Sequence, residues 1–383
     1  MRIARILTRL NLGGPARQVM ESDVRLIGMG HQVRVYCGKP EPGEGNLAQQ
    51  LQAQGVEVVR VPGLQRAICP FRDPFVVRFL RRELREWGPD IVHTHASKAG
   101  WVGRLAARGL GARTVHTFHG HVFDGHFSRI TTQVLIRIER FLARRTDVLV
   151  AVSEATRREL VAKFVAPVKH IQVVYGGADV LGLVEADRGK ATLRAKLGLG
   201  EDDLVIGVLG RLAPIKRTHL ALAAFVQAWP DLPRARLVFI GEGSGRLRLE
   251  QDLKKCAPEI KASVFLAGTW ANMAQMLPDL DLLLSASHHE GLPISMVEAG
   301  ACLVPSVATP VGGVGEFVVP GFTGWIGKDV NELARGLVVL GQDEKLRARL
   351  GAESRALALR QHEGGDFAER LEGLYLELLG NPL

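Results

Sequence analysis

Short apolar runs recur along the first half of the chain, and the segments between them repeat apolar residues at helical spacing. The runs are nearly continuous in Val, Ile and Leu, which is typical of parallel strands covered on both faces. They predict seven strands, at residues 3–7, 32–37, 56–62, 90–95, 112–118, 147–153 and 170–175. The intervening segments predict helices at residues 14–30, 73–88, 97–111 and 153–164.

The second half of the chain repeats this alternation. Its apolar runs predict five strands, at residues 204–210, 235–241, 262–268, 280–286 and 305–310. Helical spacing predicts helices at residues 218–230, 245–256 and 293–303. Strands that alternate with helices indicate a parallel α/β sheet, so we expect two doubly wound, Rossmann-like domains. Because such sheets bind ligands at the carboxyl ends of their strands, we expect the two domains to face a shared cleft.

Paired glycines in VYGGADVLG, residues 174–182, interrupt the pattern and predict the domain boundary. The expected parts are an N-terminal domain, a C-terminal domain and a last segment, at residues 1–176, 177–362 and 363–383. Four apolar residues of that segment recur at helical spacing: Phe367, Leu371, Leu374 and Leu378. They predict a C-terminal helix that closes across the domains.

The composition narrows the class of protein. Hydrophobic residues make up 46% of the 383 residues and glycine occurs 43 times, as expected of a folded α/β protein with many loops. No apolar stretch reaches the about 18–20 residues of a transmembrane helix, and basic residues interrupt the N-terminal apolar run, unlike a signal peptide. The four cysteines lack CxxC spacing, which argues against a zinc ribbon or disulfide framework and fits a reducing cytoplasm.

The net charge of +9 is unevenly distributed. Residues 1–180 contain 27 Lys and Arg against 15 Asp and Glu, a net charge of +12, whereas the remainder carries −3. A basic half favours an acidic partner such as nucleic acid, anionic lipid or a phosphorylated substrate. A solvated, arginine-rich surface explains the same charge equally well.

Two cations and two carboxylates follow predicted strands of the second half. Arg211 and Lys216 lie in the loop GRLAPIK, where they could offset the charge of a diphosphate. In HHEGLPISMVEAG, residues 288–300, Glu290 precedes a glycine turn and Glu298 lies about one turn inside the helix that follows. A helix start binds phosphate through its N–H groups, and the carboxylates would then accept hydrogen bonds from sugar hydroxyls.

Spacing alone leaves other interpretations of the two glutamates open. On one continuous helix, eight residues are a little over two turns, so Glu290 and Glu298 could form an exposed pair. They could also form a catalytic carboxylate pair, but a retaining hydrolase needs its two carboxyls about 5–5.5 Å apart across the scissile bond. Glu298 is poorly placed for that role inside the helix, so hydroxyl binding is the preferred interpretation.

Further glycine turns lead to a resemblance. IGEGSGR contains Gly241 after a predicted strand, and PVGGVGEFV precedes another predicted helix. With GRLAPIK and HHEGLPISMVEAG, the second half therefore has four loops after strands that suit phosphate binding. Together with GRLAPIK, the segment EGLPISMVEAGACLVPSVATPVGGVGEFV resembles the retaining glycosyltransferases of family 4, which have the two-domain GT-B fold. In the first half NLGGPARQV, HTHASKAGWVGRLAA, TFHGHVF and VSEATRREL fit the same family. The resemblance spans nearly the whole chain.

The resemblance implies transfer of a sugar from a nucleotide-diphosphate donor, with retention at the anomeric carbon and without a metal or other cofactor. UDP is the expected nucleotide, on its frequency in the family. The acceptor is expected to be a glycan or a lipid-linked glycan of cell-surface polysaccharide biosynthesis. The N-terminal domain would bind this acceptor and the C-terminal domain the nucleotide sugar.

Roles for individual residues follow from the same resemblance. Arg211 and Lys216 would hold the diphosphate, and Glu290 would contact hydroxyls of the donor sugar. Glu298 would contact the ribose of the nucleotide. His119, in TFHGH, would hydrogen-bond the donor sugar and orient its anomeric carbon.

Other residues would complete the donor site through their backbone or ring. They are Gly13, Gly14, Gly241, Trp270, Gly291, Leu292 and Pro293. Gly13 and Gly14 would close over the donor and shape the acceptor side, and Trp270 would neighbour the base. Pro293 has no N–H of its own to donate. Relatives carry Asn-Gly-Val-Asp at the hinge, whereas this chain has Gly-Gly-Ala-Asp at 176–179, so the contact expected from that Asn is not assigned.

A histidine-rich stretch, HTFHGHVFDGH, raises the question of a metal site. Its histidines are His116, His119, His121 and His126. The spacing fits no common zinc pattern and acidic companions are sparse, so no metal is expected. His116 could equally point into a core packed between strands.

Two basic, partly apolar helices are predicted in the first half. The predicted helix at 73–88 carries Arg78, Arg81, Arg82 and Arg85, and a further helix at 131–145 carries Arg137, Arg140, Arg144 and Arg145. Such helices could dock on an anionic membrane, which would make the protein cytoplasmic and peripheral at the inner face of the membrane. A solvated outer face is the simpler alternative.

Two other functional classes remain open. A nucleotide-sugar epimerase shares the double architecture but would act without an acceptor, and its motifs match less well. A non-catalytic nucleotide- or nucleic-acid-binding protein would explain the charge. Aromatic residues make up only 6% of the chain, which leaves few stacking platforms, so no nucleic-acid partner is expected.

Overall fold

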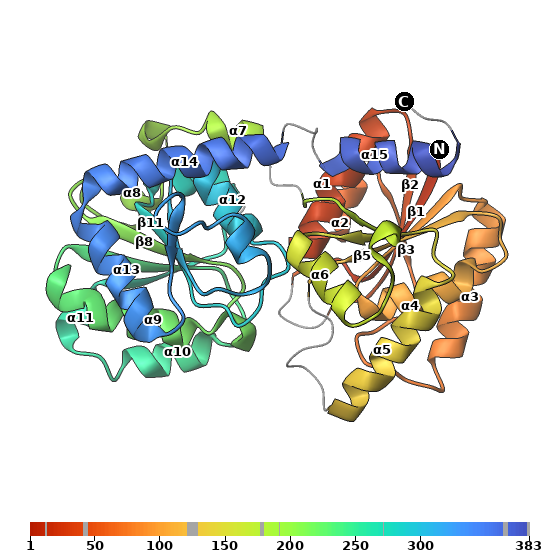
Figure 1. Cartoon of the computed structure of the whole chain (residues 1–383), viewed down its shortest axis with the longest axis horizontal. Helices are drawn as coiled ribbons and strands as arrows, with labels where there is room; N and C mark the ends of the chain where they lie inside the picture. The colour runs from red at the N-terminus through yellow and green to blue at the C-terminus, as the bar shows by residue number, and fades with distance from the viewer. Residues whose placement is uncertain are drawn as a thin grey trace. The chain divides into compact units, whose positions relative to one another are not determined.

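The chain forms two compact units, each holding one sheet covered by helices (Figure 1). The computed structural model describes residues 1–11, 14–40, 45–120, 129–176, 180–190, 192–270, 272–362 and 367–380. Unit 1 comprises Met1–Gly177 and Gly364–Leu383, and unit 2 comprises Ala178–Glu363. Each sheet is parallel in all its pairings, which confirms the predicted pair of doubly wound α/β domains.

The sheet of unit 1 has seven strands in the order β3-β2-β1-β4-β5-β6-β7. Their bounds are β1 (Arg2–Arg9), β2 (Gln32–Gly38), β3 (Glu57–Arg60), β4 (Ile91–His95), β5 (Arg113–Phe118), β6 (Val148–Ala151) and β7 (Ile171–Val173). All seven predicted strands are present. The inner strands β4 and β5 are buried on both faces, because helices cover the sheet from both sides, and this explains their continuous apolar runs. The edge strand β3 has no fully buried residue.

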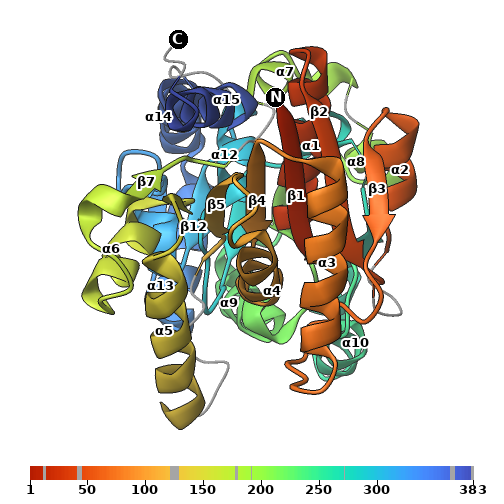
Figure 2. The ribbon, with the colours of Figure 1, turned by 90° about the vertical axis from the view of Figure 1, so that its right-hand side faces the viewer.

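The helices of unit 1 are α1 (Gly14–Gly28), α2 (Ala48–Ala53), α3 (Asp73–Trp87), α4 (Ser97–Ala107), α5 (Arg129–Ala143), α6 (Glu154–Ala162) and α15 (Phe367–Leu378). The pleat of β1 sends Ile3 and Leu7 into the core formed with α1, α2 and α15. Ala4 and Ile6 belong to the core on the opposite face. Helices α3 and α4 cover that face (Figure 2).

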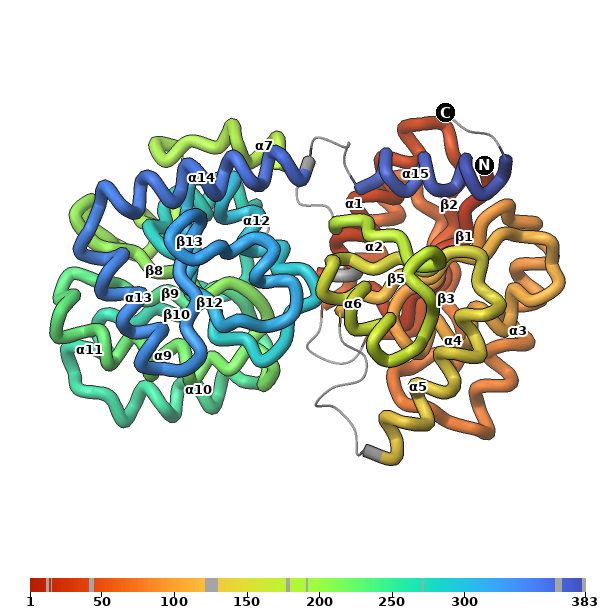
Figure 3. Tube along the Cα trace, in the orientation of Figure 1, coloured from red at the N-terminus to blue at the C-terminus, as the bar shows by residue number. Residues whose placement is uncertain are grey.

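The last helix, α15, returns to the N-terminal elements, beside α1 (Figure 3). Its Phe367, Leu371, Leu374 and Tyr375 are buried in the same core as β1 and α1. The predicted helical spacing is therefore confirmed, and it buries the apolar stripe within unit 1. A role in closing across the two units stays a prediction.

The sheet of unit 2 has the order β10-β9-β8-β11-β12-β13. Its strands are β8 (Leu204–Leu209), β9 (Ala235–Ile240), β10 (Val264–Gly268), β11 (Leu282–Ser285), β12 (Ser306–Ala308) and β13 (Gly324–Ile326). Five of them match the predicted strands. The edge strand β13 was missed, because its three residues are too few for an apolar run.

The helices of unit 2 are α7 (Val180–Val184), α8 (Leu193–Leu197), α9 (Thr218–Ala228), α10 (Arg246–Leu253), α11 (Pro258–Ala262), α12 (Ile294–Ala301), α13 (Val330–Gln342) and α14 (Glu344–His362). Apolar residues of α9, α10 and α13 pack on one face of the sheet, and those of α7, α8 and α12 pack on the other. The three predicted helices match α9, α10 and α12. Five helices of this unit were not predicted: α7, α8, α11, α13 and α14.

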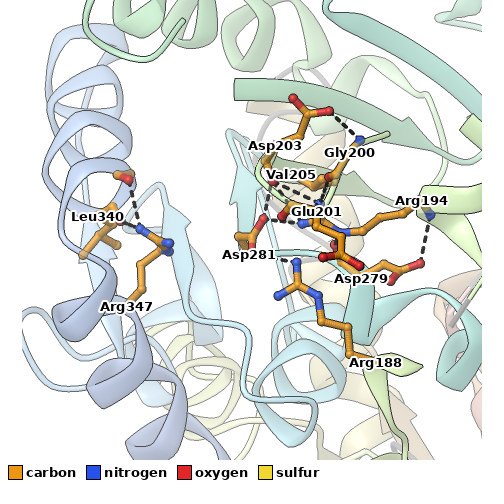
Figure 4. Close-up of polar contacts among 11 residues, drawn as sticks. Arg188, Arg194, Gly200, Glu201, Asp203, Val205, Asp279, Asp281, Leu340 and Arg347 are labelled. Carbon is orange, nitrogen blue, oxygen red and sulfur yellow. Dashed lines mark hydrogen bonds and ion pairs between the residues drawn. The ribbon is translucent and has the colours of Figure 1, made fainter. Parts of the chain in front are cut away.

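A buried arginine ties the amino ends of the unit 2 strands together (Figure 4). Arg194 of α8 donates to Asp281, just before β11, at 2.7 Å and to the carbonyl of Asp279 at 3.0 Å. The same Asp281 carboxylate accepts a 2.7 Å bond from the N–H of Val205 in β8. Burial lowers the pKa of Arg194, opposed by the nearby Asp281. This cluster lies at the edge opposite the carboxyl ends, so we assign it a structural role.

Candidate functional site

Glycines let the loops at the carboxyl edge of the unit 2 sheet approach one another closely. Gly241, directly after β9, has a φ of 140° and donates to the carbonyl of Gly268 at 2.8 Å. A Cβ at this position would lie 2.1 Å from the carbonyl oxygen of Gly210. Only glycine fits such a conformation, so the turn containing Gly241 is built by backbone contact.

The loop after β8 carries the two predicted cations. The side chain of Arg211 is exposed, and Lys216 ends a short 3₁₀ turn with its side chain partly exposed. Next to it, Arg217 donates to the carbonyls of Ala286 at 2.8 Å and Ser287 at 2.7 Å. Arg217 thereby joins the loop after β8 to the loop after β11. Sequence reasoning missed this anchor, although it directly follows GRLAPIK.

Glu290 meets Lys216 at this junction. The Lys216 ammonium lies 2.5 Å from Oε1 of Glu290, and the hydroxyl of Ser287 donates to the same oxygen at 2.6 Å. The Glu290 side chain is 13% exposed and that of Lys216 is 27% exposed. A Cβ on Gly312 would lie 1.7 Å from the carbonyl oxygen of Glu290. The loop PVGGVGEFV, which contains Gly312, therefore also packs closely on Glu290.

The helix that follows begins after both glycine and proline. Pro293 precedes α12, and its carbonyl accepts from the N–H groups of Met296 at 2.8 Å and Val297 at 3.2 Å. In the described part of the chain, the N–H groups of Gly291 and Leu292 donate no hydrogen bond. These two donors and the positive end of an eight-residue helix therefore suit an anion.

The position of Glu298 excludes one interpretation of the glutamate pair. Glu298 is the fifth residue of α12 and is half-buried, whereas Glu290 lies in the loop before the helix. The two residues do not share one continuous helix, so they are not an exposed i, i+8 pair. Their assignment to sugar and ribose stays a prediction.

Trp270 follows β10 and is half-buried. The ammonium of Lys196, from α8, lies 4.6 Å from the centre of its ring, a cation–π contact. Its indole N–H is buried and has no hydrogen-bond partner among the described residues. Contact of Trp270 with a base stays a prediction.

In unit 1, His119 follows β5 and joins a buried polar cluster. Nδ1 of His95, at the end of β4, lies 3.0 Å from Nε2 of His119. Arg5, in the middle of β1, donates to Asp23 at 2.7 Å and contacts Nδ1 of His93 at 2.5 Å. Each of Arg5, Asp23, His93 and His95 is at most 1% exposed.

Burial perturbs the titration of this cluster. It raises the pKa of Asp23 to about 6, against the opposing effect of Arg5. It lowers the pKa of His93 and His95 well below the usual value, with Arg5 adding to the shift. The pKa of His119 is lowered to about 4, first by burial and then by Arg5. The imidazoles of the cluster are therefore neutral at physiological pH.

The remaining histidines of the stretch divide into a core residue and two outside the described residues. His116 is fully buried, bonds Thr94 at 2.8 Å, and packs so closely on Gly100 that a Cβ there would lie 2.3 Å from the ring. The core interpretation of His116 is thus confirmed. His121 and His126 fall outside the described residues, and so does Gly13, whereas Gly14 begins α1. Within the described ranges, no group of three or more His, Cys, Asp or Glu could hold a metal ion.

Sequence reasoning missed most of the buried cluster. One signal was available: Arg5 interrupts an apolar run that otherwise predicts a central strand. The partners gave no such signal, because Tyr375, whose hydroxyl lies 2.5 Å from Nδ1 of His93, is 282 residues away in sequence.

Comparison with known families and structures adds an independent observation. Residues 12–180 match the family model described as Glycosyltransferase Family 4, and residues 189–357 match that of Glycosyl transferases group 1. The two matches together leave out only short segments of the chain.

Two relatives and one solved structure illustrate the similarity. A D-inositol 3-phosphate glycosyltransferase of Segniliparus rotundus is 28% identical over 283 residues, which are 72% of this chain and 62% of that protein. A UDP-Gal:alpha-D-GlcNAc-diphosphoundecaprenol alpha-1,3-galactosyltransferase of Escherichia coli is 28% identical over 331 residues, 84% of each chain. The crystal structure of Anabaena Alr3699/HepE in complex with UDP has a TM-score of 0.80 at 21% identity, covering 99% of this chain and 100% of that chain. This last likeness shows the fold.

Proposed function

This chain belongs to glycosyltransferase family 4, and we propose on that basis that it transfers a sugar from a UDP-sugar to a glycan or lipid-linked acceptor. The reaction proceeds with retention at the anomeric carbon and without a metal. It serves cell-surface polysaccharide biosynthesis. The observation that carries the proposal is the contact of Lys216 with Glu290 beside the start of α12.

The charge balance at this junction suits a diphosphate bound next to a carboxylate. Two carboxylates alone would repel a phosphate, but the 2.5 Å contact with Lys216 neutralises Glu290. Arg211 and the N–H groups of Gly291 and Leu292 then supply positive potential for the phosphates. The oxygens of Glu290 remain able to accept hydrogen bonds from sugar hydroxyls.

The chemistry follows from these roles. The departing diphosphate takes the proton of the acceptor hydroxyl on the same face of the sugar, so no protein nucleophile is needed. Lys216 and Arg211 stabilise the negative charge that develops on the leaving group. Glu298 holds the ribose, Trp270 neighbours the base, and the remaining task of the protein is alignment of the reactants.

A thermal-shift panel of nucleotide diphosphates tests donor recognition. Free UDP at 100 times its dissociation constant should stabilise the protein by about 2.7 kcal/mol. For a domain of this size that corresponds to roughly 5–10 °C in melting temperature. GDP and ADP at the same concentration are the comparison, and equal shifts from all three would contradict the choice of UDP.

A turnover assay separates the proposed transferase from the other two classes. UDP release from UDP-glucose or UDP-galactose is measured with and without glycan acceptors, and the anomeric configuration of the product is read by NMR. Acceptor-dependent release with retention supports the proposal. Conversion of the sugar to its epimer without acceptor identifies an epimerase, and a thermal shift without turnover identifies a binding protein.

The proposal includes peripheral attachment to the inner face of the membrane. No helix in the described part of the chain is long and apolar enough to cross a bilayer. Instead α5 exposes Ile130, Val134 and Phe141 at 80%, 47% and 46%, with Arg137 at the intervening helical position. An exposed stripe that combines apolar and basic side chains suits an anionic lipid surface.

Sedimentation with liposomes tests this attachment. We expect binding to vesicles containing anionic lipid and none to neutral vesicles, with release by salt. Arg137→Glu with Phe141→Ser should abolish binding, whereas Arg234→Ala, on a unit 2 loop, is the matched control. Absence of binding at low salt would refute membrane attachment while leaving the transferase proposal intact.

A further inference from the structure

A chain of hydrogen bonds leads from Arg5 to His119 inside unit 1. The guanidinium of Arg5 lies 3.4 Å from Nε2 of His95. Nδ1 of the same His95 ring lies 3.0 Å from Nε2 of His119, and the two ring centres are 5.2 Å apart. The three residues come from β1, from the end of β4 and from the position after β5.

Arg5 fixes the donor-to-acceptor direction of these hydrogen bonds, because a guanidinium has five donors and no acceptor. Its own orientation is fixed: its Nε donates to Asp23 at 2.7 Å and its Nη2 to Ser22 at 3.3 Å. The nitrogen of His95 that faces Arg5 must therefore accept. In a neutral imidazole one nitrogen carries the proton and the other accepts, so the proton of His95 is on Nδ1.

The same reasoning carries one residue further. Nδ1–H of His95 donates to Nε2 of His119, which must then be the unprotonated nitrogen. Both rings are neutral, because burial and the positive charge of Arg5 lower the pKa of each. The proton of His119 is left on Nδ1, the ring nitrogen that does not take part in this contact.

We propose that Arg5 and His95 are positioning residues that fix His119 in the Nδ1–H tautomer, so that it presents a hydrogen-bond donor to an oxygen of the sugar substrate. This inference rests on the proposed function for the identity of that substrate. It assigns His119 a specific chemical role. With Nδ1 protonated, His119 acts as a hydrogen-bond donor that orients the sugar, and it does not take the proton of the acceptor hydroxyl.

Nuclear magnetic resonance reads the tautomer directly. In protein labelled with ¹⁵N-histidine, long-range ¹H–¹⁵N correlations distinguish a protonated ring nitrogen from an unprotonated one. The signals of His119 are assigned by their loss in His119→Ala. We expect the protonated nitrogen to be Nδ1 in the wild type, and protonation on Nε2 would overturn the proposal.

Variants of His95 test the coupling. His95→Leu removes the donor, so the signals of His119 should report a mixture of the two tautomers. His95→Asn keeps an amide N–H near the place of Nδ1 and should restore the wild-type pattern. Thr94→Val is the control on the same strand, because it removes a different buried hydrogen bond, the one to His116. An unchanged tautomer in His95→Leu would overturn the coupling.

Kinetics provide the second readout. Loss of one oriented hydrogen bond should lower kcat of His95→Leu about tenfold, with KM for the donor changed less than twofold, and His95→Asn should recover most of kcat. Equal kcat in the wild type and in a folded His95→Leu variant would contradict the positioning role. If the wild type has the expected tautomer but transfers no sugar, the proposed function fails while the tautomer assignment stands.

Discussion

Replacement of Lys216 by alanine separates stability from catalysis at the unit 2 site. The contact with Glu290 is short, at 2.5 Å, but the side chains are 27% and 13% exposed. Ion pairs that water reaches contribute about 0–1 kcal/mol to stability, so Lys216→Ala should lower the free energy of unfolding by no more than that. Loss of a preorganised charge from a reaction centre costs about 3–4 kcal/mol in the transition state.

That difference converts to a fall in kcat of roughly 10²–10³-fold at saturating donor. The assay is acceptor-dependent release of UDP, with urea unfolding measured on the same preparation. Arg234→Ala is the matched control: it breaks the exposed Arg234–Asp202 pair at 2.6 Å, just before β9. The control should change neither quantity. A Lys216→Ala variant that keeps kcat within threefold of the wild type would refute the assignment of Lys216 to the leaving group.

Three further predictions concern structure and titration. Arg194→Ala should lower the free energy of unfolding by about 3–5 kcal/mol in urea titrations, without changing UDP affinity in the folded protein, because it removes the main ion-pair partner of the largely buried Asp281 carboxylate and the donor to the carbonyl of Asp279. Gly241→Ala should cost at least about 1–3 kcal/mol from its φ of 140° alone and weaken UDP binding, whereas Gly200→Ala, with ordinary contacts, should not. His119 gains a proton near pH 6.5 in the unfolded protein but only near pH 4 in the folded protein, because its folded pKa is lowered. The free energy of unfolding should therefore fall as the pH is lowered from about 6.5 to about 4, and it should fall less steeply in His119→Ala.

The fold could be predicted because its signal is local. Most predicted strands are runs of apolar residues buried on both faces, and the loops between strands mark their ends. The edge strands β3 and β10 are only partly buried, but their apolar runs still gave a local signal. The elements that were missed lack such a signal. β13 is only three residues long, and α14 has no sustained apolar stripe, because its buried residues Leu350, Ser354 and Ala358 are spaced among charged positions.

The unit 2 site could be predicted in part for the same reason. Carboxyl ends of parallel strands meet at one edge, so residues that directly follow strands were correct candidates. The sequence does not reveal which strands are neighbours. Lys216 reaches Glu290 because β8 and β11 pair, although β9 and β10 lie between them in sequence. Arg217 and Ser287 complete the junction through contacts that spacing does not predict.

The buried cluster of unit 1 is the part of the molecule least explained by stability. Removing Arg5 and Asp23 from water is expensive, and buried ion pairs are often replaced by apolar residues without loss of stability. Two buried charges in the central strand and first helix are therefore weak evidence for a structural role. Their geometry offers another reason for burying these two charges, because a guanidinium held by Asp23 and Ser22 cannot rotate. Such a fixed donor sets the proton positions of the histidines it meets, which a core of apolar side chains could not do.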